Sequence, residues 1–433
     1  MNEKLIPDII AELRWRNQIH QTTDDENIAA WLREKPRTIY IGFDPTADSL
    51  HVGHLMALMI LRRFQKAGHR VIALVGGATG MIGDPSGKSE ERKQLSEETL
   101  QHNVAAMKTQ LARFLDFHDG PGGALMVNNY DWFREYTFLA FLRNVGKFFP
   151  VSMMLAKDSV KARLERENGL SYTEFSYMLL QAYDFAHLYR HFGCELQAGG
   201  SDQWGNITTG IDLARRMEGG AQLYGLTVPL LTKSDGQKMG KTESGALWLD
   251  PRRVSPYQFY QYWINTEDAD VRKLLCFATD LTREEVDAVM REQETDPAKR
   301  VGQRRVADEI TRLVHGEEGL RAAHRATEIF FGAEIQDLDD AQLSSIFADV
   351  PSAEFSREEL EAGIPLASAF LATGLAASKS DVRRGIQQGG IYVNNRRVSD
   401  IDLRLTPEHL ASATTIVLRT GKRKYALMRL PNH

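Results

Sequence analysis

A short apolar strand that runs into a histidine-bearing helix start constrains this chain more than any other feature. Thr38–Gly42 is apolar and rich in β-branched residues, which predicts a strand. Leu55–Phe64 is largely apolar and predicts a buried helix. Between them, His51 and His54 stand three residues apart at the helix start, on one helix face.

This arrangement suits an anionic ligand. The N-terminus of a helix attracts anions through its free N–H groups and its dipole, and Gly53 lets a ligand approach the backbone. Two histidines at this spacing can also bind zinc, but no nearby cluster of cysteines or carboxylates completes a tetrahedral set. We therefore predict a site for a nucleoside triphosphate, with no metal held by the protein. Alone, the pattern is weak, because ordinary helix starts also carry histidines.

A second motif lies far along the chain. Lys238-Met-Gly-Lys-Thr242 stands in a polar loop that follows an apolar strand predicted over Leu226–Leu231. Two lysines on either side of a glycine can reach phosphates from the side opposite the histidines. A solvated surface loop is the alternative interpretation.

Together the two motifs resemble the HIGH and KMSKS signatures of class I aminoacyl-tRNA synthetases. Three further stretches extend the match in the order and spacing of bacterial-type tyrosyl-tRNA synthetases: Gly76–Lys88, Tyr177–Asp184 and Gly199–Asn206. The resemblance covers nearly the whole chain. It implies ATP-dependent activation of L-tyrosine to tyrosyl-adenylate with release of pyrophosphate, then transfer of tyrosine to the 3′ end of tRNA(Tyr). It also implies Mg²⁺ accompanying ATP, and a homodimer.

Strands and helices alternate in the first half of the chain, which predicts an α/β fold with a Rossmann-like, doubly wound parallel sheet over residues 1–250. A helical insertion is expected at about 130–170, where the resembling family has its dimer interface. A helical domain is expected over 251–332 and a linker over 333–362. Residues 363–433 are expected to form a small α+β domain that resembles the α-L RNA-binding module, with a turn at Asn394-Asn395.

Composition and charge bear on the location of the protein and on its partners. No run of 18 apolar residues exists, so no membrane span is expected, and two cysteines cannot make a disulfide framework, so a cytoplasmic location is expected. The net charge is −5, but residues 363–433 carry +7 and the remainder −12. A basic tail on an acidic body predicts RNA binding by the tail. Its candidate RNA-binding residues are Lys379, Arg383, Arg384, Arg396 and Arg397.

The resemblance also implies roles for site residues. Tyr40 and Asp184 match the pair that hydrogen-bonds the substrate phenol, and Asp84, Tyr177 and Gln181 match the groups that bind the α-ammonium. Helical spacing supports this independently, because Tyr177, Gln181 and Asp184 fall at i, i+4 and i+7 on one face. Gly200, Asp202 and Gln203 match contacts to the ribose and the adenylate, with Gln203 also beside the tyrosine. The implied ATP-binding set is Gly42, Asp44, His51, Gly53, His54, Gly200, Asp202 and Lys241.

The chemistry needs alignment and charge neutralisation rather than a protein nucleophile, because the amino-acid carboxylate itself attacks the α-phosphorus. We expect His51, His54 and Thr46 to hold the phosphates, and Lys238, Lys241 and Thr242 to close over the pyrophosphate. Lys88 and Arg92 could add positive charge, although they also fit a solvated charge run. The chain departs from the family at Ile41, where a cysteine is common, and at Gly240, where a serine is usual.

Three other functions fit part of the pattern. A tryptophanyl-tRNA synthetase is the nearest, but an indole N–H needs one acceptor and no phenol partner, which disfavours a Tyr40–Asp184 pair. A related ligase that activates a small carboxylate without RNA would not need the basic tail. An RNA-binding scaffold with an inactive synthetase fold would not need the histidines and lysines of both motifs.

Overall fold

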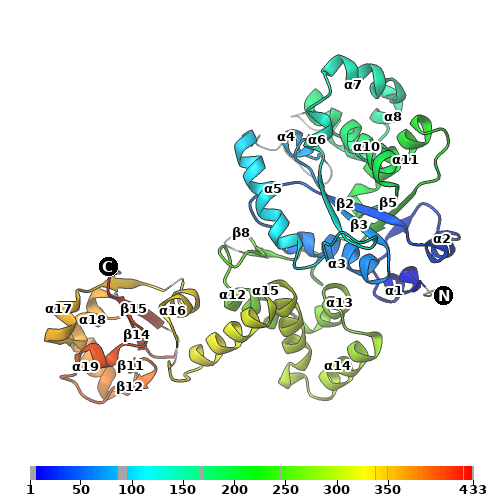
Figure 1. The fold of residues 1–433 in the computed structure, drawn as a ribbon. Coiled ribbons are helices and arrows are strands. Elements are labelled where there is room, and N and C mark those ends of the chain that lie inside the picture. Colours follow the sequence, from blue (N-terminus) through cyan, green and yellow to red (C-terminus); the bar gives the residue numbers. More distant parts are fainter. Residues whose placement is uncertain are drawn as a thin grey trace. The chain divides into compact units, whose positions relative to one another are not determined.

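The computed structural model describes residues 6–85, 95–165, 169–242, 245–336, 338–348, 350–422 and 424–431 (Figure 1). The chain divides into two compact units. The first, here the catalytic unit, comprises Met1–Asp250 and Ile264–Val314, and the second, the C-terminal unit, comprises Pro251–Trp263 and His315–His433.

The catalytic unit is built on a six-stranded sheet in the order β1-β6-β5-β2-β3-β4. Neighbouring strands are parallel except at β1, which pairs antiparallel with β6. The predicted parallel α/β sheet is therefore confirmed, while β1 was not predicted, because it is only two polar residues long. The strands are β1 Gln21–Thr22, β2 Thr38–Phe43, β3 Arg70–Val75, β4 Leu125–Asn128, β5 Cys194–Gly200 and β6 Tyr224–Val228.

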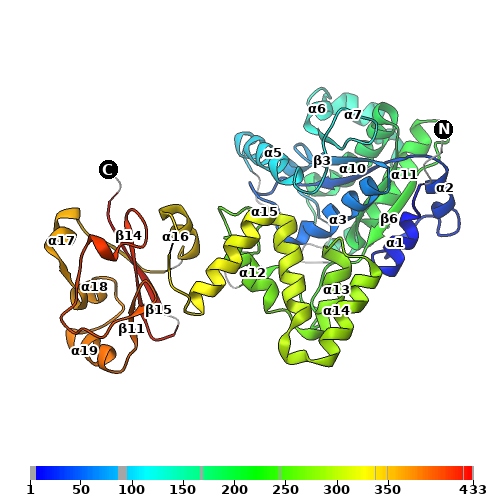
Figure 2. The same cartoon turned by 60° about the horizontal axis from the view of Figure 1, so that its bottom comes forward.

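Helices cover both faces of this sheet. α10 and α11 pack with Tyr40, Ile72 and Leu74 on one face, and α3 follows β2 on the other (Figures 1 and 2). Since successive side chains of a strand point to opposite faces, Ile39 and Ile41, also buried, face away from Tyr40. The helices up to β6, outside residues 130–170, are α1 Ile9–Trp15, α2 Ile28–Glu34, α3 Val52–Lys66, α4 Thr79–Ile82, α5 Glu97–Leu111, α10 Tyr172–Phe192, η2 Ser201–Gln203 and α11 Trp204–Met217.

Short helices fill the expected insertion after β4. Thr137 caps α7 by accepting a hydrogen bond from Ala140 N, and Pro150 precedes α8. In both views α7 lies at the end of the catalytic unit opposite α13 and α14 (Figures 1 and 2). The helices are α6 Tyr130–Phe133, α7 Phe138–Asn144, η1 Gly146–Phe148, α8 Val151–Leu155 and α9 Asp158–Leu164.

Helices dominate from residue 256 to 330, but they are divided between the two units. α13 and α14 pack in the catalytic unit, whereas α12 and the second half of α15 belong almost entirely to the C-terminal unit. Gly316, with φ 73° and ψ −179°, interrupts α15 next to this division. The single helical domain expected over 251–332 is therefore not how the chain packs. The elements are α12 Pro256–Ile264, α13 Asp268–Ala278, α14 Arg283–Thr295, η3 Pro297–Lys299 and α15 Val301–Phe330.

The C-terminal unit has a five-stranded sheet in the order β12-β11-β14-β15-β9, with both faces buried. Ile416 and Leu418 of β14 join one apolar cluster with α18 and α19, while Val417 joins another with α15 and α16. The elements are α16 Asp340–Ile346, β9 Ser352–Glu354, α17 Arg357–Ala362, β10 Ile364–Pro365, α18 Leu366–Ala372, α19 Lys379–Gln387, β11 Ile391–Val393, β12 Arg396–Arg397, β13 Arg404–Leu405, η4 Pro407–His409, β14 Thr415–Thr420 and β15 Lys424–Arg429.

The linker expected over 333–362 is wrong. β9 pairs in parallel with β15, Ser352 opposite Leu427, and Leu343 and Phe347 of this range are buried in the core of the C-terminal unit. The range was interpreted as a linker because its composition is acidic and mixed. Its helix α16 and its strand β9 are too short to give a clear periodic pattern of apolar residues. The turn predicted at Asn394-Asn395 is confirmed, since both residues have positive φ, 49° and 62°.

No helix in the described part of the chain combines the length and the apolar character needed to cross a membrane.

Candidate active site

The candidate site residues gather where the parallel strands of the catalytic unit end. Asp44 follows β2, Asn129 follows β4 and Gly200 ends β5. The carboxyl ends of parallel strands share one edge of the sheet, the usual position of a ligand site in this architecture. The glycine-rich turn after β3 is held there by two asparagines at the end of β4 and just after it. Asn128 Oδ1 accepts from Gly77 N at 3.1 Å, and Asn129 Oδ1 accepts from Ala78 N at 2.7 Å.

The two histidines form the cap of α3. His51 Nδ1 accepts a hydrogen bond from Gly53 N at 3.0 Å, and His54 Nδ1 accepts one from His51 N at 3.1 Å. The rings stack with centroids 4.0 Å apart. An Nδ1 that accepts carries no proton, so each neutral ring keeps its proton on Nε2 and has a donor there. A Cβ on Gly53 would lie 2.7 Å from His51 Cε1, so a side chain there would push the His51 ring out of its present position.

The lysine motif lies against the start of the same helix. Its loop folds as a hairpin, in which Thr232 pairs with Lys238. Further along, Leu247 O accepts a hydrogen bond from Val52 N at 2.9 Å. Gly240 has φ 83°, and a Cβ on it would lie 2.8 Å from Val52 Cβ. The departure from the family at Gly240 thus coincides with a point where the two motifs touch.

The lysines themselves are exposed. Lys238 and Lys241 lie on the surface, whereas Met239 and Gly240 between them are buried. Lys241 begins the short strand β7 Lys241–Thr242, which pairs with β8 Gly245–Ala246, and the side chain of Thr242 is not described. Lys88 and Arg92 lie outside the described residues. Thr46 is exposed after β2.

Asp184 is buried at the opposite end of the site with both carboxylate oxygens engaged. Oδ1 accepts from Trp132 Nε1 at 2.9 Å, and Oδ2 accepts from Asn129 Nδ2 at 3.1 Å. Burial raises the pKa of Asp184 to about 8, the two hydrogen bonds oppose the rise, and the nearby charge of Asp44 adds to it. Asn129 and Trp132 were not predicted as site residues, although Asn129 lies just after the apolar run Leu125–Val127, and a polar residue after such a run is a usable signal.

Tyr40 carries an unsatisfied hydroxyl. Its side chain is fully buried beside Phe185, and its oxygen has no hydrogen-bond partner in the described part of the chain. Burial, with a contribution from Asp184, raises the pKa of this phenol well above its usual value. A buried polar group without a partner is costly, so this hydroxyl is poised to hydrogen-bond a ligand.

A chain of amides links the remaining predicted tyrosine-site residues. Gln203 Nε2 donates to Asp84 Oδ2 at 2.8 Å, and Gln181 Nε2 donates to Gln203 Oε1 at 3.1 Å. Asn206, which was not predicted, donates to Gln181 Oε1 at 2.9 Å and to Gln203 Oε1 at 3.2 Å. The Tyr177 hydroxyl lies 3.4 Å from Asp44 Oδ2. The stripe predicted on α10 therefore does meet partners from other elements.

The predicted nucleotide contacts lie on the surface of the same edge. Gly42 at the end of β2 and Asp202 in η2 are exposed, and Gly200 is partly exposed. A Cβ on Gly200 would lie 2.7 Å from Asp202 Oδ1. Ile41, where the family often has a cysteine, is 3% exposed and packs in the core of the unit.

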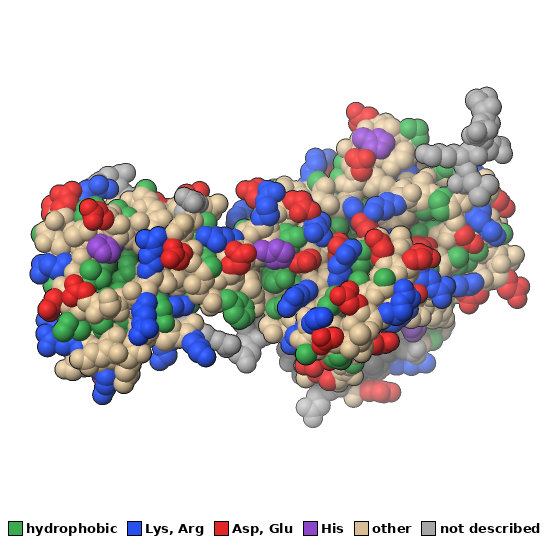
Figure 3. Space-filling model, turned by 90° about the horizontal axis from the view of Figure 1, so that it is seen from below, with side chains coloured by type: hydrophobic (Ala, Val, Ile, Leu, Met, Phe, Trp, Pro, Cys, Tyr) green, Lys and Arg blue, Asp and Glu red, His purple; other side chains and the backbone are tan. Residues whose placement is uncertain are grey.

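In the C-terminal unit, all five predicted RNA-binding residues are exposed, but they do not share one face. A Cβ on Gly389, just after α19, would lie 1.8 Å from Arg397 Nη2, so Arg397 lies on the α19 side of β12. Arg396 forms an ion pair with Glu334 at 3.1 Å on the other side. On the face drawn in Figure 3, Lys and Arg side chains of this unit are interspersed with Asp and Glu.

Among the described residues, no group of three or more His, Cys, Asp or Glu side chains is arranged to hold a metal ion.

Two family models match the chain. The model described as tRNA synthetases class I (W and Y) matches residues 32–332, and the model described as tyrosine--tRNA ligase SYY-like C-terminal domain matches residues 342–428. The chain is 57% identical over 423 residues to the tyrosine--tRNA ligase of Rhodopirellula baltica, covering 98% of this chain and 96% of that protein. It is 51% identical over 422 residues to the tyrosine--tRNA ligase of Geobacillus stearothermophilus, covering 98% and 99%.

Solved structures agree. A C-terminally truncated mitochondrial tyrosyl-tRNA synthetase from Aspergillus nidulans matches with a TM-score of 0.67 and 32% identity, covering 75% of this chain and 94% of that one. The tyrosyl-tRNA synthetase of Archaeoglobus fulgidus matches with a TM-score of 0.54 at 17% identity, covering 72% of this chain and 100% of that one, a likeness of fold alone.

Proposed function

The chain belongs to the class I tyrosyl-tRNA synthetases, and we propose that the side chains at the carboxyl edge of its sheet divide the reaction between them. It is a tyrosine--tRNA ligase, which activates L-tyrosine with ATP to tyrosyl-adenylate, releases pyrophosphate and transfers the tyrosine to tRNA(Tyr).

The unpaired, buried Tyr40 hydroxyl near Asp184 is the observation that best supports a phenol-binding pocket. A phenol O–H both donates and accepts, so it can donate to Asp184 and accept from Tyr40, whereas an indole N–H only donates. Trp132 and Asn129 hold the carboxylate in place. A pocket built for a hydroxyl rejects the substrate that lacks it, a behaviour for which tyrosyl-tRNA synthetases are themselves the standard illustration.

We assign the α-ammonium to the polar groups at the other end of the amide chain. Asp84 supplies a carboxylate beside Gln203, and Tyr177 and Gln181 lie on the α10 face that also carries Asp184. Asn206 orients Gln181 and Gln203 through its amide N–H groups. The substrate carboxylate then faces the phosphate side of the site.

On the phosphate side, the Nε2–H groups of His51 and His54 donate to ATP oxygens, helped by Thr46 and the N-terminus of α3. Exposed Lys238 and Lys241, with Thr242, approach the β- and γ-phosphates, and Lys88 and Arg92 add charge. Negative charge that develops on pyrophosphate as the α-phosphorus is attacked is thereby neutralised. Gly42, Asp44, Gly53, Gly200 and Asp202 line the nucleotide's remaining surface.

Mg²⁺ enters with ATP in this proposal. Mg²⁺ keeps several waters and binds chiefly to substrate phosphates, so it does not need a full set of protein ligands. It would supply further charge neutralisation on the phosphates. The chain's own contribution is the set of lysines and histidines around them.

The exposed arginines of the C-terminal unit are assigned to tRNA phosphates. Arg397 lies beside α19, which carries Lys379, Arg383 and Arg384, whereas Arg396 is ion-paired with Glu334. Arg397→Ala should therefore raise the KM for tRNA more than Arg396→Ala does, without changing tyrosine activation. Equal effects would contradict this division.

A homodimer through the helical insertion is supported by its surface. Of the nine large hydrophobic residues exposed in the described part of the chain, six lie between residues 138 and 172. Large hydrophobic side chains that are exposed and concentrated in one segment of a chain favour a protein interface there. Leu139→Asp should lower the mass measured by analytical ultracentrifugation, whereas Phe331→Asp, in the C-terminal unit, should not. The six are Phe138, Leu139, Val151, Leu155, Leu164 and Tyr172, 43% to 76% exposed.

We place the enzyme in the cytoplasm, since both of its cysteines, Cys194 and Cys276, are free and buried.

Exchange of labelled pyrophosphate into ATP, measured with each of the twenty amino acids, tests the substrate directly. Tyrosine alone should support fast exchange. Exchange with tryptophan but not tyrosine would indicate the tryptophanyl alternative, and no exchange at all would favour an inactive RNA-binding scaffold.

A further inference from the structure

We infer that Asp270 and Lys273 of α13 are positioning residues for tyrosine activation, because they fix the hairpin that carries Lys238 and Lys241. This inference rests on the role proposed above for those lysines. Neither residue belongs to a signature motif, and neither touches the site.

The N-terminal half of α13 holds the first arm of the hairpin. Asp270 is 3% exposed, and its Oδ2 accepts from Ser234 N at 3.1 Å and from Ser234 Oγ at 3.3 Å. One turn further along, Lys273 Nζ donates to the backbone oxygen of Thr232. Positions 270 and 273 share one helix face, so both side chains can hydrogen-bond to residues 232–234.

Hydrogen bonds between the two arms of the hairpin connect residues 232–234 to the segment that carries Lys238 and Lys241. Lys233 N donates to Gln237 O at 2.8 Å, Met239 N donates to Leu231 O at 3.0 Å, and Thr232 pairs with Lys238. The first arm is therefore hydrogen-bonded to the second arm on both sides of Lys238, at Gln237 and at Met239. Since Lys238 and Lys241 are exposed, their own packing does not fix them, and the hairpin's anchorage decides where they point.

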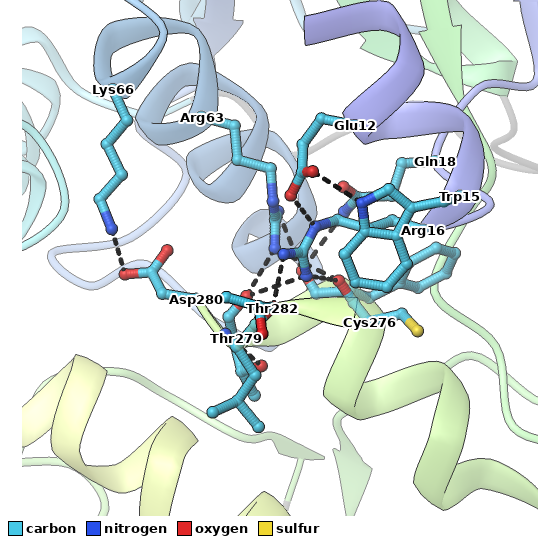
Figure 4. A network of polar contacts seen from close by, with 12 residues as sticks. Glu12, Trp15, Arg16, Gln18, Arg63, Lys66, Cys276, Thr279, Asp280 and Thr282 are labelled. Carbon is cyan, nitrogen blue, oxygen red and sulfur yellow. Dashed lines mark hydrogen bonds and ion pairs between the residues drawn. The ribbon is translucent and has the colours of Figure 1, made fainter. Parts of the chain in front are cut away.

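The C-terminal end of α13 is bound to the body of the catalytic unit (Figure 4). Two buried arginines donate to the carbonyls that end the helix: Arg16 Nη1 to Cys276 O at 2.9 Å, and Arg63 Nη2 to Thr279 O at 2.7 Å. Asp280 forms an ion pair with Lys66 at 2.7 Å. Arginines at a helix C-terminus satisfy its unpaired carbonyls and stabilise its dipole.

Helices α3 and α13 are joined at one end, and each positions part of the candidate phosphate site at its other end. Arg63 and Lys66 stand in the last turn of α3, whose first turn carries His51 and His54, while α13 carries the hairpin at its other end. α3 and α13 thus tie the histidines and the lysines, which bind opposite sides of one ATP, to a common support. Misplacing a charged group by about 1 Å can lower a rate by up to about a hundredfold, so such a support matters for the reaction.

The test is single-turnover activation of tyrosine by Asp270→Ala, with tyrosine binding measured by equilibrium dialysis. The activation rate constant at saturating tyrosine and ATP should fall about tenfold, and the affinity for pyrophosphate in the reverse reaction should fall too. The Kd for tyrosine should stay within about twofold, because the tyrosine pocket does not include this helix. A general loss of structure would weaken tyrosine binding as well and would overturn the inference.

Matched variants distinguish a positioning role of Asp270 from a general effect on folding. Arg272→Ala, on the same helix, breaks only an exposed ion pair with Asp287 and should leave activation unchanged. Asp270→Asn keeps one acceptor for Ser234 and should recover most of the rate, while Ser234→Ala and Lys273→Met should each cost about two- to threefold. Equal losses in Arg272→Ala and Asp270→Ala would overturn the inference.

Combined variants separate this inference from the proposed function. If Asp270 acts through the two lysines of the hairpin, then adding Asp270→Ala to a variant that already carries Lys238→Ala and Lys241→Ala should slow activation by no more than about twofold. Fully additive losses would overturn the positioning role. Full activity of Lys241→Ala alone would instead overturn the proposed role of the lysines.

Discussion

In the proposed tyrosine pocket the polar groups are buried and hydrogen-bond to one another. On the proposed phosphate side the lysines are exposed and stand on a hairpin that helix α13 anchors. Asp184 is 1% exposed and bonded to Trp132 and Asn129. Lys238 and Lys241 lie on the surface, beside a glycine packed on Val52. We expect selectivity to come from the preformed pocket and the reaction rate to depend on groups that gather around the phosphates.

The largest effect is expected at Asp184. Asp184→Asn keeps the shape but turns an NH₂ toward Trp132 Nε1 or Asn129 Nδ2, which are both donors, and it removes the acceptor of the phenol. Trp132 Nε1 and Asn129 Nδ2 then compete for one amide oxygen, and a buried donor left without an acceptor costs about 1–3 kcal/mol. We expect kcat/KM for tyrosine in pyrophosphate exchange to fall by roughly a hundredfold or more. A loss of less than about threefold would show that the pocket does not depend on this carboxylate.

On the phosphate side, His51→Ala and Lys241→Ala should each lower the activation rate constant by roughly ten- to a hundredfold. The Kd for tyrosine should not change, because neither side chain touches the tyrosine pocket. Stopped-flow measurement of activation with equilibrium dialysis of tyrosine separates the two quantities. Collapse of tyrosine binding with an unchanged rate at saturation would reverse the comparison.

Two glycines of the hairpin offer a matched pair. Gly236 and Gly240 both have φ 83°, so alanine at either costs about 1–2 kcal/mol of backbone strain. Only Gly240 touches α3, where a Cβ would lie 2.8 Å from Val52 Cβ, and Gly236 has open space around it. Gly240→Ala should therefore slow activation by about tenfold, and Gly236→Ala by much less. Similar rates for both variants would mean that contact with α3 does not position the lysines.

Tyr40→Phe should have a smaller and more specific effect. The kcat/KM ratio of tyrosine to phenylalanine should fall by about two- to tenfold, since one hydrogen bond contributes about 0.5–1.5 kcal/mol. The melting temperature of the tyrosine-free protein should not fall, because the hydroxyl has no partner to lose among the described residues. A lower melting temperature with an unchanged ratio would assign the hydroxyl to the fold rather than to the substrate.

The free energy of unfolding should also depend on pH through Asp184. The pKa of Asp184 is raised from 3.8 to about 8, so between these values the folded state binds a proton that the unfolded state has lost. The resulting stabilisation is complete below about pH 4 and is lost as the pH rises through about 8. Urea unfolding of the tyrosine-free protein between pH 5 and 9 should show this decline, and Asp184→Asn should flatten it.

Local patterns were enough for much of the fold. The strand predicted over Thr38–Gly42 is β2, and the helix predicted over Leu55–Phe64 lies within α3, because apolar runs and helical periodicity depend on nearby residues only. The same locality explains the errors. The supposed linker contributes Leu343 and Phe347 to a core whose other residues lie far away in sequence, and no local pattern shows that.

The sequence by itself determined the family and the sheet, and it predicts the residues that carry the chemistry, because the two signature motifs and the α10 stripe are local patterns. Only the tertiary structure decided how those residues are supported. Asn129 and Trp132 reach Asp184 from another element, Gly240 lies against Val52, and Asp270 holds Ser234. Each of these contacts joins segments distant in the chain, and each depends on close packing and on the pairing of buried polar groups, which exist only once the chain has folded.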